Sequence, residues 1–573
     1  MPSTFEYRIH PAVGIARMGN SATTYFLANE KPRQPIDPVQ ATIPGQADKR
    51  AAGLRDADGH LCKQGARFRV FAYEYDLVPV VGVGPPARGA LLAVWECTPA
   101  NYDISWTVQV ANHKSQTTGT ALLSAKVPNA PDPVTLPNAP ASALRTFTGK
   151  PAGRLDLGSC FVDGDGRLVV LGSSGKAKRF EAAASPGVPA SLFWAGFEDD
   201  AADGPVTAQV TPKAGSVMSD AGEPARPATG AWVVNALPAY GADLRATVTL
   251  HDLAMNHAYE TAKKTRGQQP EDLSKLVTWT QMIRPLLLAQ YSVYWAIDHH
   301  GMRQPYVIPA HKAKDDGYKT WLRPARRTDK LLPENIWLHF KLGGTKGMPE
   351  PAPAYDSTGS IGLHSMPDLL YLTITELQQK AVDQWAAGTL PRGRGLPETS
   401  PLPLYKPYQL DLAHLETCSG GSFFPGIEVD RRAHWYRTWE GRHGTCPEHY
   451  DVRVTREIDD TGTDVGPAQA GYLTTHLACP WQADFKDCSG LYWPHSRPIR
   501  VRPEAGGAGF IDFMSNAAGD LPSHVSVDAG ANGAVRGGLA EHFWKLGVMR
   551  YDAASTEIRE NQRLAGFGAQ AAP

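Results

Sequence analysis

Apolar and polar residues alternate over several short segments in the first half of the chain. Residues 63–73 place Phe68, Val70 and Ala72 on one face, and residues 106–110 alternate in the same way. Successive side chains of a β-strand point to opposite faces, so both segments are predicted to be half-buried strands. Further short apolar stretches continue this pattern at residues 168–171, 232–234 and 246–250. The first part of the chain is therefore predicted to be β-rich.

The hydrophobic period changes after about residue 251. Residues 275–298 predict a mostly buried helix, with Pro285 near its start or at a kink. Thr373 and Glu376 have the spacing of a capping box, and Gly388 stands where a C-terminal cap belongs. The apolar face predicted for the helix between them consists of Leu377, Ala381, Val382, Trp385 and Ala386.

These patterns predict an α+β protein in two parts. Residues 1–250 form a β-rich N-terminal domain, and residues 251–573 form a mixed, loop-rich domain that carries the functional site. The chain has 573 residues, 55 of them glycine and 47 proline, which favours many turns and irregular connections over a helical bundle.

Composition excludes several classes of partner. The net charge is -1 at pH 7, which gives no electrostatic case for nucleic acid or for an anionic membrane. The most apolar run, residues 286–297, is too short to span a bilayer, and no basic-then-apolar leader follows Met1. We expect a cytoplasmic protein. Export by a non-classical route, which needs no such leader, stays open. The seven cysteines are odd in number and scattered, so no disulfide framework is predicted.

The residues around Cys418 carry the clearest candidate chemistry. If the segment from Asp411 is helical, then Asp411, His414, Leu415 and Cys418 share one face. Ser419 and the two glycines after it would end that helix. A nearby base would favour the reactive thiolate, whereas the charge of a carboxylate would raise the pKa of the thiol. The alternative is a buried structural cysteine.

Three other patterns have weaker chemical interpretations. His443, Cys446 and His449 are closely spaced donors, but a zinc site usually needs a fourth ligand, and no metal is predicted. Asp163 and Asp165 resemble the start of a calcium loop without its later glutamate, so a hairpin turn is the preferred interpretation. Gly14 and Gly19 match no nucleotide-binding fingerprint and are interpreted as turn glycines.

Two segments, considered together, resemble one known family. They are Cys418-Ser-Gly-Gly-Ser-Phe-Phe-Pro-Gly-Ile-Glu428 and Pro480-Trp481-Gln-Ala-Asp484-Phe. Taken alone, Trp481 would be interpreted as a core residue. With the earlier segments Ile9–Arg17, Gln64–Arg69, Val110–Lys114, Gly166–Gly172 and Asp203–Val206, the chain resembles the cysteine tryptophylquinone oxidases, the family of L-lysine ε-oxidase and glycine oxidase. The separation of 481 minus 418, or 63 residues, also fits that family.

The resemblance implies a cofactor made from the chain itself. The indole of Trp481 would become an ortho-quinone joined to the sulfur of Cys418 by a thioether, giving cysteine tryptophylquinone. A separate flavoprotein would complete this maturation. The implied reaction is oxidative deamination of the primary amine of an amino acid through a Schiff base on the quinone. Its products are a carbonyl compound, ammonia and, with oxygen as the acceptor, hydrogen peroxide. A homo-oligomer is expected by the same analogy.

The resemblance leaves several roles open. Family members have an acid before the cysteine that assists cofactor formation; here His414 is one helical turn before Cys418, and Asp411 is two turns before it. Asp484, His443 and His449 are candidates for the catalytic base. Two other functions stay as alternatives: a metal-dependent hydrolase or oxygenase that uses His443, Cys446 and His449, and a non-catalytic member that acts as a binding module.

Overall fold

The structure is a computed structural model of the chain. The residues that it describes are 3–34, 36, 38–78, 87–114, 129–137, 142–150, 153–179, 197–213, 224–246, 248–256, 259, 278–293, 296, 340–342, 372–386, 389–390, 407–419, 428–429, 438–443, 450–459, 463–475, 477, 479–483, 495–496, 498–503, 509–513, 542–552 and 557–564.

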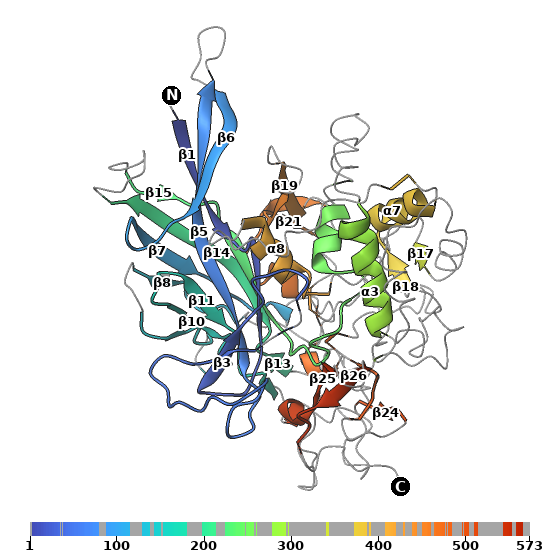
Figure 1. The fold of residues 1–573 in the computed structure, drawn as a ribbon. Helices are drawn as coiled ribbons and strands as arrows, with labels where there is room; N and C mark the ends of the chain where they lie inside the picture. Colours follow the sequence, from blue (N-terminus) through green and yellow to red (C-terminus); the bar gives the residue numbers. More distant parts are fainter. Residues whose placement is uncertain are drawn as a thin grey trace.

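One large sheet dominates the N-terminal part of the described chain (Figure 1). Its strand order is β8-β7-β14-β16-β2-β5-β11-β10-β9, with β1, β3, β4, β6 and β15 paired to members of this path. The bounds are β1 (Ser3–His10), β2 (Val13–Arg17), β3 (Thr24–Leu27), β4 (Gln40–Thr42), β5 (Lys63–Val78), β6 (Ala87–Glu96), β7 (Tyr102–Val108), β8 (Val134–Leu136), β9 (Arg145–Thr146), β10 (Ser159–Val162), β11 (Leu168–Leu171), β14 (Ala202–Pro212), β15 (Arg226–Pro227) and β16 (Ala231–Ala236).

The remaining described elements are short, and most lie beside the sheet on the right of Figure 1. The helices are a segment at 250–256, the π-helix η2 (Trp279–Ile283), α3 (Arg284–Val293), α7 (Glu376–Ala386), α8 (Pro407–Leu415), and the 3-10 turns η7 (Tyr472–Thr474), η8 (Trp481–Ala483) and η9 (Phe543–Lys545). Two-stranded pairs are β12 (Ala177–Arg179) with β13 (Phe197–Asp199), β17 (Phe340–Leu342) with β18 (Leu372–Ile374), β19 (Trp439–His443) with β20 (Tyr450–Val454), β21 (Arg456–Ile458) with β22 (Asp464–Pro467), β23 (Arg500–Val501) with β24 (Ile511–Asp512), and β25 (Val548–Asp552) with β26 (Glu557–Asn561).

The central strands of the sheet are buried on both faces. In β16, Ala231 and Val233 contribute to a core on one side of the sheet. Trp232 and Val234 contribute to a second core on the other side, together with Cys418. This alternation follows from the period of two along a strand. The second core is where the C-terminal elements pack onto the sheet.

The structure confirms the β-rich prediction and corrects details of it. Strands cover residues 63–73, 168–171 and 232–234 as predicted. Residues 246–250 were predicted to be a strand, and that prediction is wrong. The hydroxyl of Thr249 accepts a hydrogen bond from Asp252 N and caps a helix that begins at residue 250. The division of the chain near residue 250 stays a prediction.

The N-terminal cap of α7 differs from the predicted one. The helix after Thr375 buries Leu377, Ala381, Val382 and Trp385 as expected. Its capping box, however, is formed by Thr375 and Gln378, since each accepts a hydrogen bond from the backbone N–H of the other. Thr373 lies in β18 instead, and Gly388 lies outside the described residues.

Gly14 is not a turn residue, because it lies inside β2. A Cβ atom at Gly14 would meet the ring of Phe68, so close packing explains the glycine. In place of the helix predicted at 275–298, the described residues show helical structure over 279–293, with Thr278 as its N-cap. There Pro285 stands just after the π-helical segment gives way to α3.

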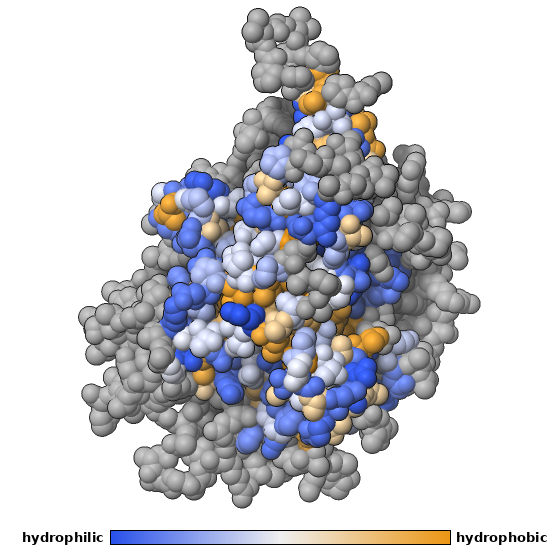
Figure 2. Space-filling model, turned by 90° about the vertical axis from the view of Figure 1, so that its left-hand side faces the viewer, coloured by the Kyte–Doolittle hydropathy of each residue, from blue (hydrophilic) through white to orange (hydrophobic). Residues whose placement is uncertain are grey.

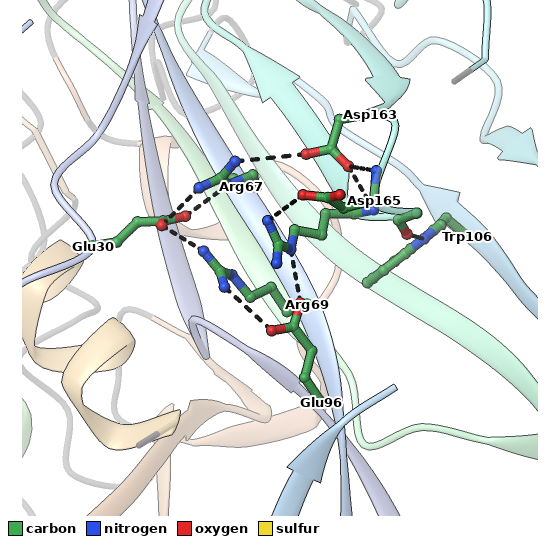
Figure 3. A network of polar contacts seen from close by, with 9 residues as sticks. Glu30, Arg67, Arg69, Glu96, Trp106, Asp163 and Asp165 are labelled. Atoms are coloured by element: carbon green, nitrogen blue, oxygen red, sulfur yellow. Dashed lines mark hydrogen bonds and ion pairs between the residues drawn. The ribbon is translucent and has the colours of Figure 1, made fainter. Parts of the chain in front are cut away.

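A network of largely buried ion pairs surrounds two arginines of β5 (Figure 3). Glu30 accepts hydrogen bonds from Arg67 and Arg69, and Arg67 also lies 3.7 Å from Asp163. Burial alone would raise the pKa of Glu30, but its bonds to the arginines lower it to about 2. Asp163 belongs to the turn between β10 and β11, and Asp165 pairs with an arginine. The hairpin interpretation of this turn is thereby confirmed.

The described surface on the sheet side is mostly hydrophilic at its edges, with apolar residues gathered near its middle (Figure 2). The ends of β1, β5 and β6 extend beyond the rest of the sheet at the top of Figure 1, and exposed Val78 and Leu92 lie on β5 and β6. Among the described residues, we find no helix with the length and apolar character needed to cross a membrane.

Asp203 links the sheet to the C-terminal part. Its carboxylate accepts hydrogen bonds from Trp232 Nε1 (2.8 Å), Leu473 N (2.9 Å) and Thr474 Oγ1 (2.6 Å), and its side chain is fully buried. A buried donor that loses its acceptor costs about 1–3 kcal/mol. This side chain therefore joins η7 and Trp232 to β14, beside the backbone hydrogen bond from Gly471 N to Asp203 O.

We expect Asp203→Ala to lower the free energy of unfolding by at least about 3 kcal/mol, because three buried donors lose their acceptor at once. Chemical denaturation of both proteins measures the difference. Asp103→Ala is the control, since the side chain of Asp103 is 51% exposed and its ion pair with Lys213 should contribute less than about 1 kcal/mol. Equal losses in the two variants would contradict the role given to Asp203.

Candidate active site

Helix α8 is anchored to the first strands of the sheet through Asp411. One oxygen of Asp411 accepts a hydrogen bond from Ala12 N at 2.6 Å, and His10 Nδ1 lies 2.9 Å from the same oxygen. The other ring nitrogen of His10 contacts the hydroxyl of Tyr73 at 2.9 Å. Asp411 is therefore engaged in docking the helix. Its predicted part in cofactor formation stays a prediction.

His414 makes the next contact between α8 and the sheet. Its Nδ1 accepts a hydrogen bond from Ile15 N at 3.1 Å, so we infer that the proton of the neutral ring is on Nε2. Within the described part of the chain, Nε2 has no hydrogen-bond partner. Burial lowers the pKa of His414 to about 4, so the ring is neutral at pH 7. His414 has a proton to donate and no free nitrogen to accept one.

The sequence predicted Cys418 at the end of the helix, but α8 ends at Leu415, three residues earlier. The backbone N–H of Cys418 donates to Leu415 O at 3.4 Å, and its carbonyl accepts from Leu250 N at 2.8 Å. The side chain is 1% exposed and the thiol is free. Burial, and then the charge of Glu428, raise the pKa of this thiol well above its usual value. The sulfur is therefore held as a protonated thiol.

Glu428 is the charged group beside this thiol. Arg17 donates to one of its oxygens, and Ser419 N donates to the other at 2.5 Å. Ser419 directly follows Cys418, so the carboxylate lies against the backbone that carries the thiol. Burial opposes the ionisation of Glu428, but the charge of Arg17 outweighs it and lowers the pKa of Glu428 below its usual value. Arg17 also donates to the carbonyl of Thr417 at 2.7 Å, which fixes the end of the helix.

His495 completes this group of buried polar side chains. Its Nδ1 lies 3.7 Å from the nearer oxygen of Glu428, and the residue is 3% exposed. Neither ring nitrogen has a hydrogen-bond partner among the residues that the structure describes. Burial lowers the pKa of His495 to about 4, so it is a neutral imidazole at pH 7.

Trp481 is fixed by a second buried ion pair. Its backbone N–H donates to Asp199 Oδ2 at 2.7 Å, and its ring meets the ring of Phe543 edge-on at a centroid distance of 5.3 Å. Asp199 in turn accepts from Lys114 Nζ at 2.7 Å and Asn112 Nδ2 at 2.9 Å. The side chains of Asp199 and Lys114 are both fully buried. The indole of Trp481 is 1% exposed.

Cys418 and Trp481 lie in two different core clusters, which meet at one place in the chain. Cys418 belongs to the cluster that contains Ala236, and Trp481 belongs to the cluster that contains Leu237. The two clusters therefore meet where β16 ends, although the sequence separates the two residues widely. Cys418 comes from the end of a helix, and Trp481 opens the 3-10 turn η8.

The other predicted residues are described only in part. Asp484 and His449 lie outside the described residues, as does Cys446. The backbone of His443 ends strand β19, where it pairs with Tyr450. Over the described ranges, no group of three or more His, Cys, Asp and Glu side chains is arranged to hold a metal ion.

The sequence analysis missed three of the buried polar residues around the thiol. Arg17 and Glu428 end two of the segments that carry the family resemblance, so their places were a usable signal. His495 stands in Trp493-Pro-His-Ser496, a stretch with no pattern that would single it out. Only packing brings these three side chains together.

Two family models match the chain. The model described as L-lysine epsilon oxidase N-terminal matches residues 10–146 and 138–234, and the model described as L-lysine epsilon oxidase C-terminal domain matches residues 362–503. Together they cover more than half of the chain. The L-lysine 6-oxidase of Marinomonas mediterranea is 22% identical over 563 residues, which cover 84% of this chain and 71% of that protein.

Solved structures show a similar fold. The crystal structure of L-Lys epsilon-oxidase from Marinomonas mediterranea has a TM-score of 0.63 and 16% identity, and the likeness covers 97% of this chain and 94% of that chain. The crystal structure of that enzyme's Schiff base intermediate with L-Lys has a TM-score of 0.62 and 16% identity, over 97% of this chain and 95% of that chain.

Because His414 is buried, the free energy of unfolding of the protein depends on pH. Between about pH 6.5 and pH 4 the unfolded chain binds a proton at this residue and the folded chain does not, so wild-type stability is lost as pH falls through this window. We expect the unfolding free energy of wild type minus that of His414→Asn to decrease by about 1.4 kcal/mol for each pH unit in this range.

Urea denaturation of both proteins at several pH values from 4 to 7.5 measures this difference. Asparagine keeps an acceptor near Ile15 N, so the comparison isolates the titrating ring. A difference that does not change with pH would show that His414 is not held neutral by burial.

Proposed function

Since the chain belongs to the L-lysine epsilon oxidase family, we propose that it is an oxidase that acts on the primary amine of an amino acid. Oxidative deamination of this kind gives a carbonyl product and ammonia, and we propose that oxygen accepts the electrons and forms hydrogen peroxide. The substrate class rests on the curated relative, whose name states that it acts on L-lysine.

We propose that the cofactor is cysteine tryptophylquinone, made from Cys418 and Trp481. The residues fit this group in three ways: the thiol is free, both side chains are buried, and the two core clusters that contain them meet at the end of β16. The third of these observations carries the proposal. Such a quinone supplies an electrophilic carbonyl that accepts a primary amine and a ring that accepts two electrons. A flavoprotein partner is proposed for its formation, and a homo-oligomer stays an expectation by analogy.

The protein's own residues supply a dry and fixed environment for this chemistry. Asp199 holds the backbone of Trp481, and Arg17 ties the carbonyl of Thr417 to the carboxylate of Glu428. Because these groups are buried, their charges act more strongly than they would in water. The neutral ring of His414 carries its proton on Nε2, which has no hydrogen-bond partner in the described part of the chain. The base that takes the proton from the substrate carbon is proposed among Asp484, His443 and His449.

We expect protein co-produced with its flavoprotein partner to be about 28 Da heavier than its sequence, because two oxygen atoms are gained and four hydrogen atoms are lost. A tryptic map should give the Cys418 and Trp481 peptides as one linked species. Peroxide release should follow the addition of one or more amino acids from a panel that includes L-lysine and glycine.

Cys418→Ser and Trp481→Phe should both lose the linked peptide and release no peroxide above background. Trp106→Phe is the matched control, since Trp106 is also 1% exposed but lies in the core of the N-terminal sheet. It should keep the linked peptide. If the two wild-type peptides appear separate and unmodified, the oxidase proposal fails, and a binding role becomes the better explanation.

A further inference from the structure

The thiol of Cys418 and the carboxylate of Glu428 form a buried pair. Each residue is 1% exposed, and the carboxylate accepts a hydrogen bond at 2.5 Å from Ser419 N, the residue directly after Cys418. Arg17 donates to the other oxygen of Glu428 and also to the carbonyl of Thr417, the residue before Cys418. The carboxylate is therefore fixed in place and ionised, with the thiol against it.

This arrangement keeps the sulfur unreactive until a proton acceptor acts. A protonated thiol is a poor nucleophile, and the charge of Glu428 opposes formation of the thiolate. Any bond made by Sγ must therefore coincide with transfer of the thiol proton to a neighbouring group. Sγ also lies 3.9 Å from Ser419 O, but a peptide carbonyl is a far weaker base than a carboxylate.

The two residues before Cys418 that the sequence suggested are not available as acceptors. The carboxylate of Asp411 is occupied by Ala12 N and the ring of His10. The Nδ1 atom of His414 is occupied by Ile15 N, and its remaining nitrogen carries the proton. Glu428, ten residues after the cysteine, is the carboxylate that the fold brings to the thiol.

We propose that Glu428 is the general base that takes the thiol proton when Sγ of Cys418 is joined to the Trp481 ring, and that His495 receives this proton from Glu428. The proposal rests on the function proposed above. In this step the Sγ–H bond and one ring C–H bond break, and an Sγ–C bond forms. The thiol proton goes to Glu428, the ring proton goes to water, and two electrons go to the oxidant, a flavoprotein or dioxygen.

His495 is suited to the second transfer. It lies 3.7 Å from the nearer oxygen of Glu428, and its two ring nitrogens have no hydrogen-bond partner in the described part of the chain. A buried neutral imidazole with a free nitrogen can accept a proton from a carboxylic acid and restore the carboxylate. The ion pair between Glu428 and Arg17 is then restored as well.

The test compares Glu428→Gln with Glu416→Gln as a matched control. Glu416 is also a buried carboxylate close to Cys418, but it pairs with Arg245 and with the backbone of Arg33. General bases contribute about 100-fold or more to a rate, so the linked peptide should form at least about 100-fold more slowly in Glu428→Gln. In Glu416→Gln it should form within about threefold of the wild-type rate.

A second measurement, the rate of alkylation of Cys418, distinguishes a general base at Glu428 from a residue that only supports the fold. In protein produced without the flavoprotein, alkylation of Cys418 by iodoacetamide should be faster in Glu428→Gln, because loss of the charge lowers the pKa of the thiol. Labelling of the buried thiols Cys62 and Cys160 should not change. Faster labelling of all three would indicate general loosening of the fold and would overturn the proposal.

His495→Gln keeps the proposal testable if Glu428→Gln does not fold, since it leaves the pair of Glu428 and Arg17 intact. We expect it to slow formation of the linked peptide at least tenfold without changing the melting temperature by more than a few degrees. Wild-type rates in His495→Gln or in folded Glu428→Gln would overturn the proposal. Absence of a linked peptide in the wild type would instead overturn the proposed function.

Discussion

Two backbone N–H groups at the start of the chain obtain their hydrogen bonds from helix α8, and the candidate site depends on this. Strand β2 pairs with β16 over its whole length but with β5 at Arg17 alone. Asp411 accepts from Ala12 N, and His414 accepts from Ile15 N. A buried N–H without an acceptor costs about 1–3 kcal/mol, so these two bonds fix the position of the helix along the strand. The end of the helix, and Cys418 with it, is placed as a consequence.

Each of the two residues proposed to form the cofactor lies beside a buried ion pair. Arg17 and Glu428 flank Cys418, while Lys114 and Asp199 hold the backbone of Trp481. Buried ion pairs contribute little net stability, because desolvation offsets much of their attraction. They do disfavour alternative packings, since displacing one member would leave the other as an unpaired buried charge. Such pairs are well suited to holding two distant segments in one geometry before a covalent bond joins them.

Much of the fold follows from local patterns. The alternation in β5, the apolar face of α7 and the helix before Cys418 are properties of neighbouring residues, and the structure contains all three. The errors arose where a distant contact decided the outcome. The segment at residues 246–250 has the composition of a strand, but Thr249 bridges to Ser419 and then caps a helix. Gly14 fits a turn in sequence, but the ring of Phe68 explains it.

For the candidate site too, local sequence determines some features and tertiary packing determines the others. The sequence alone identified the family through the segments that contain Cys418 and Trp481, because short motifs keep their order and spacing in the chain. It could not decide which group faces the thiol, since helical spacing pointed to His414 and Asp411. The tertiary structure assigned both of those residues to the hydrogen bonds of the sheet, and it brought Glu428, with His495 beside it, to the turn that carries Cys418. Burial and long-range pairing determine proton acceptors, and neither is encoded in local spacing.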